Sequence, residues 1–182
     1  MGGTVSNWSI VVSCVEGILH EHKKMGCQDR ASYYMKGGRV SIALADGAGF
    51  SEHSHVGAQV VTRYVCRYMV RNFDRVLSKD DDRIRQDVSS VILRLLEATA
   101  QNAKVEIRQL ASTLLCVAFN EDAFICLHVG DGVIGMLSNG RVVPVSLPYN
   151  DEFANVTCFT VSDDLEGSLR VTKGGACQEH CV

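Results

Sequence analysis

The sequence predicts an α+β domain of packed layers, in which two consecutive helices stand between runs of strands along the chain. Two segments, 55–77 and 83–104, repeat apolar residues at helical spacing, one directly after the other. Short β-rich runs bounded by turn signals stand before and after them. Strands grouped in this way are typical of α+β layers, because parallel sheets alternate each strand with a helix. The 182 residues, 46% of them apolar, suffice for the core of one domain.

The N-terminal part of the chain predicts three strands. Trp8 to Val15 is one β-rich run. Residues 31–36 and 39–45 flank Gly37-Gly38, which is the signal for a two-residue hairpin turn. Such a turn determines the register of every residue pair behind it. Counted back from this turn, Asp29 falls opposite Asp46.

The hairpin register also predicts which side chains share a face. Three apolar pairs lie on one face: Ala31 with Leu44, Tyr33 with Ile42, and Met35 with Val40. We expect this to be the core face, because every member is apolar and side chains alternate along a strand. The opposite face carries Ser32, Tyr34, Lys36, Arg39 and Ser41.

The two aspartates end the apolar row at one rim of the sheet. Directly opposite residues have Cβ atoms about 4.5–5.5 Å apart, so two carboxylates there repel each other. A divalent cation with oxygen ligands, Mg²⁺ or Mn²⁺, relieves that repulsion. Gly47 follows Asp46 and allows close backbone approach, so its carbonyl can also reach an ion. The alternative is a pair of ordinary turn or cap aspartates at strand ends.

The helical segments have recognisable beginnings. Ser54 is positioned to cap the first helix. Three aspartates, Asp80 to Asp82, precede the second helix, where acidic side chains are favourable next to the helix dipole.

The C-terminal part of the chain predicts further strands, and two of them are joined by Asn139-Gly140. The expected strands are 112–119, 123–129, 133–138, 141–146, 159–162 and 169–172. Gly130-Asp131-Gly132 follows one of them. Asp131 is a possible metal ligand at a sheet rim, although such a residue is more often part of a turn. His128 lies within the strand and is expected to be a satisfied core or edge histidine.

Composition excludes several classes of protein. The net charge of −3 argues against nucleic acid binding. The sequence shows neither an apolar run long enough for a membrane span nor a signal peptide, so we expect a cytoplasmic protein that does not interact with membranes. Reduced thiols are then expected, with Cys14, Cys116 and Cys126 acting as small buried apolar residues.

Six motifs in order carry a family resemblance. They are Gly17 to His20, Gly26-Cys27-Gln28-Asp29, Ala45-Asp46-Gly47-Ala48-Gly49 with Gly57-Ala58, Ala111-Ser112-Thr113, Gly130-Asp131-Gly132-Val133-Ile134 and Asn155-Val156-Thr157-Cys158-Phe159-Thr160. Over about residues 17–165 the chain resembles the metal-dependent protein phosphatases of the 2C type, with the closest likeness to a bacterial subgroup. The resemblance implies two antiparallel sheets packed face to face, with helices outside.

The resemblance also implies a chemistry. Two Mn²⁺ or Mg²⁺ ions hold a bridging water that attacks the phosphorus of phosphoserine or phosphothreonine in a phosphoprotein. The matching metal positions are Asp29, Asp46 and the Gly47 carbonyl, with Asp131 at a third, weaker site. Asp29 and Asp46 are thereby the catalytic residues, acting through the metal-bound water. Lys24 stands near the place of a phosphate-binding arginine, but lysine lacks the bidentate fork.

The chain departs from the family pattern at its C-terminal end. We expect residues 1–174 to form a 2C-like domain that lacks the last strands and helices, including a second Asp-Gly motif, with a polar tail over 175–182. Nothing in the spacing of Asp163 and Asp164 favours them as substitutes for the missing acids, and Cys177, His180 and Cys181 make at most half of a zinc site. A non-catalytic domain that binds a phosphoprotein, and an unrelated hydrolase of small phosphoesters, stay open. An incomplete sandwich also predicts self-association through an exposed sheet edge.

Overall fold

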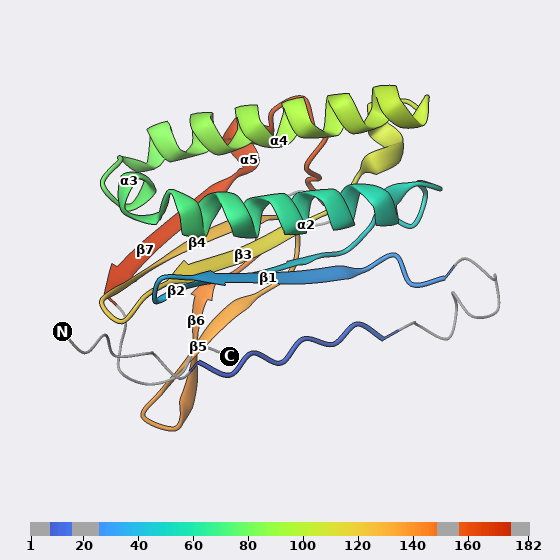
Figure 1. The fold of residues 1–182 in the computed structure, drawn as a ribbon. Coiled ribbons are helices and arrows are strands. Elements are labelled where there is room, and N and C mark those ends of the chain that lie inside the picture. Colours follow the sequence, from blue (N-terminus) through green and yellow to red (C-terminus); the bar gives the residue numbers. More distant parts are fainter. Residues whose placement is uncertain (1–7, 16–25, 149–156, 176–182) are drawn as a thin grey trace.

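A five-stranded antiparallel sheet carries helices on one face and a small hairpin on the other (Figure 1). The computed structural model describes residues 8–15, 26–148 and 157–175. The five-stranded sheet has the order β1-β2-β3-β4-β7, and β5 and β6 form a separate two-stranded sheet. This arrangement confirms the α+β class with antiparallel sheets and helices.

The elements follow the expected order. The strands are β1 Arg30–Lys36, β2 Arg39–Ala45, β3 Leu114–Phe119, β4 Ala123–Val129, β5 Ile134–Ser138, β6 Arg141–Ser146 and β7 Arg170–Gly175. The helices are α2 Ser54–Arg71, α3 Phe73–Leu77, α4 Asp81–Ala103, the 3₁₀ helix η1 Ile107–Leu110, and α5 Leu165–Ser168.

The predicted register of the first hairpin is confirmed. Lys36 pairs with Arg39, and the pairing continues in step to Arg30 and Ala45. Both turn glycines have positive φ angles, 59° at Gly37 and 75° at Gly38, which is the backbone of a type I′ turn. Two consecutive residues in this conformation allow one register, since other residues rarely adopt it.

The predicted core face of this hairpin is wrong. Tyr33, Met35 and Leu44 are 59%, 42% and 43% exposed. Helix α2 covers the other face, where the Ser32 hydroxyl lies 3.1 Å from the Thr62 hydroxyl. Small polar side chains with a partner pack closely under a helix, so polarity alone misidentified the covered face. Val40, at the far end of the predicted face, is buried in a second, smaller apolar cluster.

Helix α2 packs closely against its neighbours but does not begin with the expected cap. The cap position is His53, and no side chain bonds there; Ser54 is the first helical residue instead. A Cβ at Gly57 would lie 2.0 Å from the Leu110 carbonyl oxygen, so glycine lets α2 touch η1. Helix α4 begins as predicted among acidic residues, and the Asp80 carboxylate accepts the amide of Arg83.

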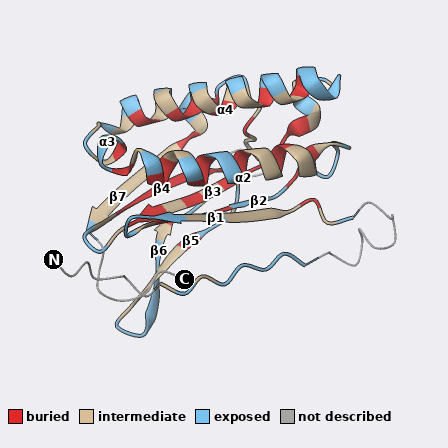
Figure 2. Cartoon of the chain, in the orientation of Figure 1, coloured by how far each residue is buried: buried red, intermediate tan, exposed pale blue. Residues whose placement is uncertain are grey.

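The main core lies between the helices and the central strands. Figure 2 shows buried residues gathered where α2 and α4 face β3 and β4. The cluster includes Met69, Phe73, Ile92, Leu96 and Leu127. Each such side chain contributes about 1.5–3 kcal/mol on burial. Within the described ranges, no helix combines the length and the apolar character that crossing a membrane requires.

Three further expectations are corrected. Residues 8–15 form no strand; Trp8 instead packs edge-on against Phe119, with ring centroids 4.8 Å apart. Residues 159–162 lie in a turn, which the Ser162 amide closes by donating to the Phe159 carbonyl at 3.0 Å. Cys14 is exposed, whereas Cys116 and Cys126 are buried.

Candidate metal centre

One end of the sheet aligns four residues in a single row across β1 to β4. The β1–β2 register, continued one position beyond the Arg30–Ala45 pair, brings Asp29 opposite Asp46. The β2–β3 register continued from Leu44 brings Asp46 opposite Thr113, and the Thr113 amide donates to the Asp46 carbonyl at 2.9 Å. The β3–β4 register then brings Thr113 opposite Gly130. Because residues two apart share a face, both aspartates belong to the face turned away from α2.

Gly47 is held by close backbone contacts next to this row. It forms an isolated bridge with Ser112, and the Ala48 amide donates to the Ala111 carbonyl at 3.0 Å. The hydrogen bonds flank Gly47 and Ser112, which therefore form a non-hydrogen-bonded pair. In such a pair the carbonyl of each residue points away from its partner. The Gly47 carbonyl therefore points away from β3, toward the side of Asp29.

Buried polar atoms lie beneath Gly47. Gln28 is buried, and its Nε2 donates to the Ser51 carbonyl at 3.1 Å. Its Oε1, like the Ser54 hydroxyl, is buried without a hydrogen-bond partner. Gly47 follows Asp46, so its Cβ position, 2.8 Å from the hydroxyl of the first α2 residue, lies on the face opposite the aspartates, and these polar atoms are not part of the metal centre.

The Asp131 turn lies at the same end of the sheet but farther along it. Gly130 has φ +110°, and a Cβ there would lie 2.6 Å from the Thr113 methyl group. The Thr157 hydroxyl donates to Asp131 at 3.4 Å. Asp131 is exposed and lies two strands from Asp46, about 10 Å away at ordinary strand spacing. It is therefore a separate position and not a third member of the Asp29–Asp46 pair.

His128 is the satisfied histidine that the sequence predicts. Its Nδ1 lies 2.7 Å from the Ser146 hydroxyl, and its Nε2 lies 3.1 Å from the Gly130 carbonyl. A carbonyl only accepts, so Nε2 carries the proton and Ser146 donates to Nδ1. Burial, then the charge of Arg170, lowers the pKa of His128 to about 4. The imidazole is thus neutral at physiological pH and supports the turn before Asp131.

The donor set fits a hard divalent cation only in part. Two carboxylates and a backbone carbonyl are all oxygen donors, as Mg²⁺ and Mn²⁺ prefer. No group of three or more histidine, cysteine, aspartate or glutamate side chains suited to a metal occurs among the described residues. The Asp164 carboxylate accepts the Gly167 amide at 2.9 Å and acts as a helix cap. Lys24, Cys177, His180 and Cys181 lie outside the described residues.

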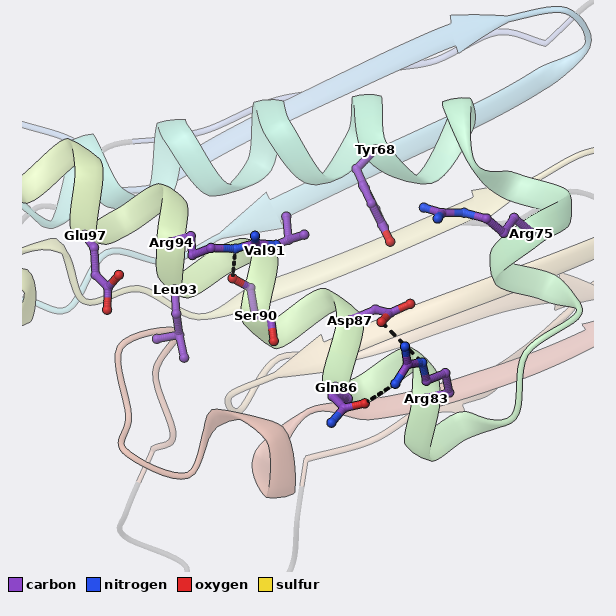
Figure 3. Close-up of a pocket in the computed structure, with 10 residues that line it drawn as sticks. All are labelled: Tyr68, Arg75, Arg83, Gln86, Asp87, Ser90, Val91, Leu93, Arg94 and Glu97. Atoms are coloured by element: carbon purple, nitrogen blue, oxygen red, sulfur yellow. Dashed lines mark hydrogen bonds and ion pairs between the residues drawn. The ribbon is translucent and has the colours of Figure 1, made fainter.

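A groove of about 720 Å³ lies elsewhere, between α2, α3 and α4 (Figure 3). Its polar groups largely pair with one another: Arg83 lies 3.5 Å from Asp87, and Arg94 donates to the Ser90 carbonyl at 3.0 Å. It is formed by the helical layer, whereas the aspartates belong to the opposite face of the sheet. The groove is therefore not part of the candidate metal centre.

Sequence reasoning missed three contributors to this end of the sheet. The Asp46 amide donates to the Thr113 hydroxyl at 2.9 Å, which holds the loop after β2. Gln28 anchors the turn that follows Gly47. Phe50 and Phe159 stack edge-on beside it, with ring centroids 5.6 Å apart. The motif Ala111-Ser112-Thr113 pointed to the first contributor, but no local pattern pointed to the aromatic pair.

An antiparallel sheet covered by two long helices, with carboxylates at one rim, has the architecture of a phosphatase domain of the 2C type. Residues 16–180 match the family "Protein phosphatase 2C", and the chain belongs to that family. It is 25% identical over 169 residues to "Serine/threonine-protein phosphatase 3" of Escherichia coli (strain K12). That match covers 90% of this chain but 66% of the relative, so the chain spans about two thirds of the relative's length.

Solved structures share the fold. A bacterial serine phosphatase matches with a TM-score of 0.60 at 13% identity, over 84% of this chain and 69% of that chain. The serine/threonine phosphatase Stp1 from Staphylococcus aureus matches with a TM-score of 0.58 at 15% identity, over 82% and 65%. The catalytic domain of PstP, described in complex with two manganese ions, gives 0.51 at 15% identity, over 84% and 67%.

Proposed function

We propose that this chain is a metal-dependent protein phosphatase domain that hydrolyses phosphoserine and phosphothreonine in proteins. The observation that carries the proposal is the placement of Asp29 and Asp46 in one row, on one face, next to Gly47. Membership of the 2C family supports the reaction class, and the two manganese ions described for PstP support the choice of metal.

In this proposal the protein supplies oxygen ligands and an open rim. Asp29, Asp46 and the Gly47 carbonyl hold the metal, and Asp131 contributes to a weaker site. When bound, Mn²⁺ or Mg²⁺ supplies an acidified water as nucleophile and neutralises phosphoryl charge. The Thr113 hydroxyl accepts the Asp46 amide and so holds the backbone that carries the carboxylate. In the same proposal Lys24 binds the substrate phosphate as a point charge. The proposed location of the protein is the cytoplasm.

Hydrolysis assays test the proposal. The chain should release phosphate from p-nitrophenyl phosphate and from a phosphothreonine peptide when Mn²⁺ is present, and EDTA should abolish the release. Asp46→Asn should lower kcat/KM at least 100-fold, since it removes one charge from the metal site. Asp122→Asn, in the turn at the other end of β4, is the matched control. Metal-independent turnover, or an Asp46→Asn variant with full activity, would refute the proposal.

A non-catalytic domain that binds phosphoprotein is the second candidate. It is favoured by the lack of any group of three or more metal-binding side chains within the described ranges. Calorimetric titration with Mn²⁺ separates the two candidates. Two tightly bound ions favour the enzyme, whereas one weak ion together with phosphopeptide binding favours the binding domain.

A further inference from the structure

An aromatic pair, exposed Phe50 and half-buried Phe159, involves the loop that follows Asp46. Phe50 is 75% exposed, although burial of such an apolar ring is favourable. Its ring meets that of Phe159 edge-on, with centroids 5.6 Å apart and planes at 81°. We call this pair the aromatic wall. The two rings come from distant parts of the chain, so both segments must be in place for the wall to exist.

Hydrogen bonds from residues on either side of it fix the turn that carries Phe50. The Ser51 amide donates to the Ala48 carbonyl at 2.9 Å, which closes the turn. Buried Gln28 donates to the Ser51 carbonyl at 3.1 Å, and the Ser51 hydroxyl donates to the Arg108 carbonyl at 3.2 Å. Phe50 is therefore held outward by its backbone and cannot easily turn into the core.

The segment that carries Phe159 is fastened to the same rim. The amide of buried Thr160 donates to the Ser112 carbonyl at 2.8 Å. Two residues before Phe159, the Thr157 hydroxyl reaches the Asp131 carboxylate at 3.4 Å. The aromatic wall thus connects the loop that follows Asp46 with the segment that contacts the Asp131 turn.

Chain geometry sets the reach of the wall. Phe50 is four residues beyond Asp46, so their Cα atoms are at most about 14 Å apart. An extended peptide advances about 3.3–3.6 Å per residue. With its phosphoresidue at the aspartate pair, a peptide can place a side chain one to four positions away against the rings. A small phosphoester has no such side chain.

We propose that the aromatic wall binds an apolar side chain flanking the phosphoresidue, and that it thereby selects phosphopeptide substrates by sequence. The proposal rests on the phosphatase function above and adds the substrate class of the same site. The exposed Phe50 ring and the half-buried Phe159 ring offer apolar area and ring edges but no charge, so leucine, methionine or an aromatic residue fits them better than a charged residue.

The test is a leucine scan of a phosphothreonine peptide. Leucine replaces alanine at each of the four positions on either side of the phosphothreonine, and kcat/KM is measured with Mn²⁺. The full chain should prefer leucine over alanine about tenfold at one position or more, because a buried side chain of this size supplies at least 1.4 kcal/mol. In Phe50→Ala that ratio should fall to about two or less, mainly through KM.

Two variants serve as comparisons. Phe159→Ala should lose the same preference at the same position, because it removes the other half of the wall. Tyr64→Ala removes an exposed aromatic ring from α2, on the helical side, and should keep the preference. The leucine-to-alanine ratio is measured within each variant, so a general loss of activity does not imitate the effect.

Failure of this proposal is distinguishable from failure of the phosphatase function. Wild-type activity without any leucine preference, or a preference that survives Phe50→Ala, overturns the aromatic wall alone. If no phosphoester is hydrolysed, the phosphatase function fails, and fluorescence anisotropy with labelled leucine and alanine peptides tests the wall. Equal affinity for the two peptides then overturns it, and tighter leucine binding that Phe50→Ala abolishes supports it.

Discussion

A Cβ at position 47 would lie 2.8 Å from the Gln28 carbonyl oxygen and 2.8 Å from the Ser54 hydroxyl. Gly47→Ala must therefore displace backbone, and it should lower the free energy of unfolding by about 1–3 kcal/mol. Gly49→Ala is the matched control, because its nearest neighbour is Gln28 Oε1 at 4.0 Å. Urea denaturation measures both variants. Equal stabilities for the two would contradict the close approach at Gly47.

The Asp46 amide donates to the Thr113 hydroxyl at 2.9 Å, and this bond should protect the amide from hydrogen exchange with solvent. Thr113→Val keeps the side-chain shape but loses the acceptor, which is worth about 1 kcal/mol. Hydrogen exchange of the Asp46 amide should then become roughly five- to tenfold faster. Thr113→Ser retains the hydroxyl and should leave that amide protected. Similar exchange in the two variants would show that another group holds the loop.

Acid should destabilise the protein through His128. Its folded pKa of about 4 lies below the ordinary value of 6.5, so the unfolded chain binds the proton first as pH falls. Stability linked to this residue is present above pH 6.5 and is lost toward pH 4, by up to roughly 3 kcal/mol. Arg170 opposes protonation of the ring, whereas Asp131 favours it.

His128→Gln isolates this contribution. Urea denaturation of both proteins between pH 4 and 7 gives a difference curve, in which acidic side chains common to both cancel. The wild type should lose more stability than the variant as pH falls through this window. Parallel curves would mean that the pKa of His128 is the same in the folded and unfolded states, which would contradict the lowered folded value.

Self-association through the exposed sheet stays a prediction that the structure motivates. In the described part of the chain, β1 is an edge strand, and Tyr33, Met35 and Leu44 leave apolar surface exposed beside it. Unpaired edges and apolar faces promote pairing with another chain. Light scattering should show a mass that rises with protein concentration. Tyr33→Lys with Leu44→Lys should reduce that rise, and a monodisperse wild-type monomer would contradict the prediction.

Local turn chemistry made the hairpins predictable. Gly37-Gly38 and Asn139-Gly140 both adopt positive φ angles, and such turns leave little choice of register. The position of Asp29 opposite Asp46 followed from that register without tertiary information. The partners of His128 were not predictable, but its place within an apolar strand was enough to expect a satisfied side chain.

Long-range packing explains what the sequence did not predict. The covered face of the first hairpin depends on Thr62 and Cys116, which meet Ser32 and Ser41 from distant segments. The aromatic wall likewise depends on two segments, those of Phe50 and Phe159, that lie far apart in the sequence. The pattern of apolar residues distinguishes the two faces of a strand, but it does not say which face another element covers. The face that carries Tyr33 was therefore wrongly predicted to be the core face.

The most direct test of the central claim is calorimetric titration of the full chain with Mn²⁺. The Asp29–Asp46 pair should bind the ion, and Asp29→Asn or Asp46→Asn should each weaken binding at least tenfold, because a single carboxylate leaves the ion undercoordinated. Asp122→Asn should bind as the wild type does. Wild-type affinity retained in both Asp29→Asn and Asp46→Asn would contradict the account.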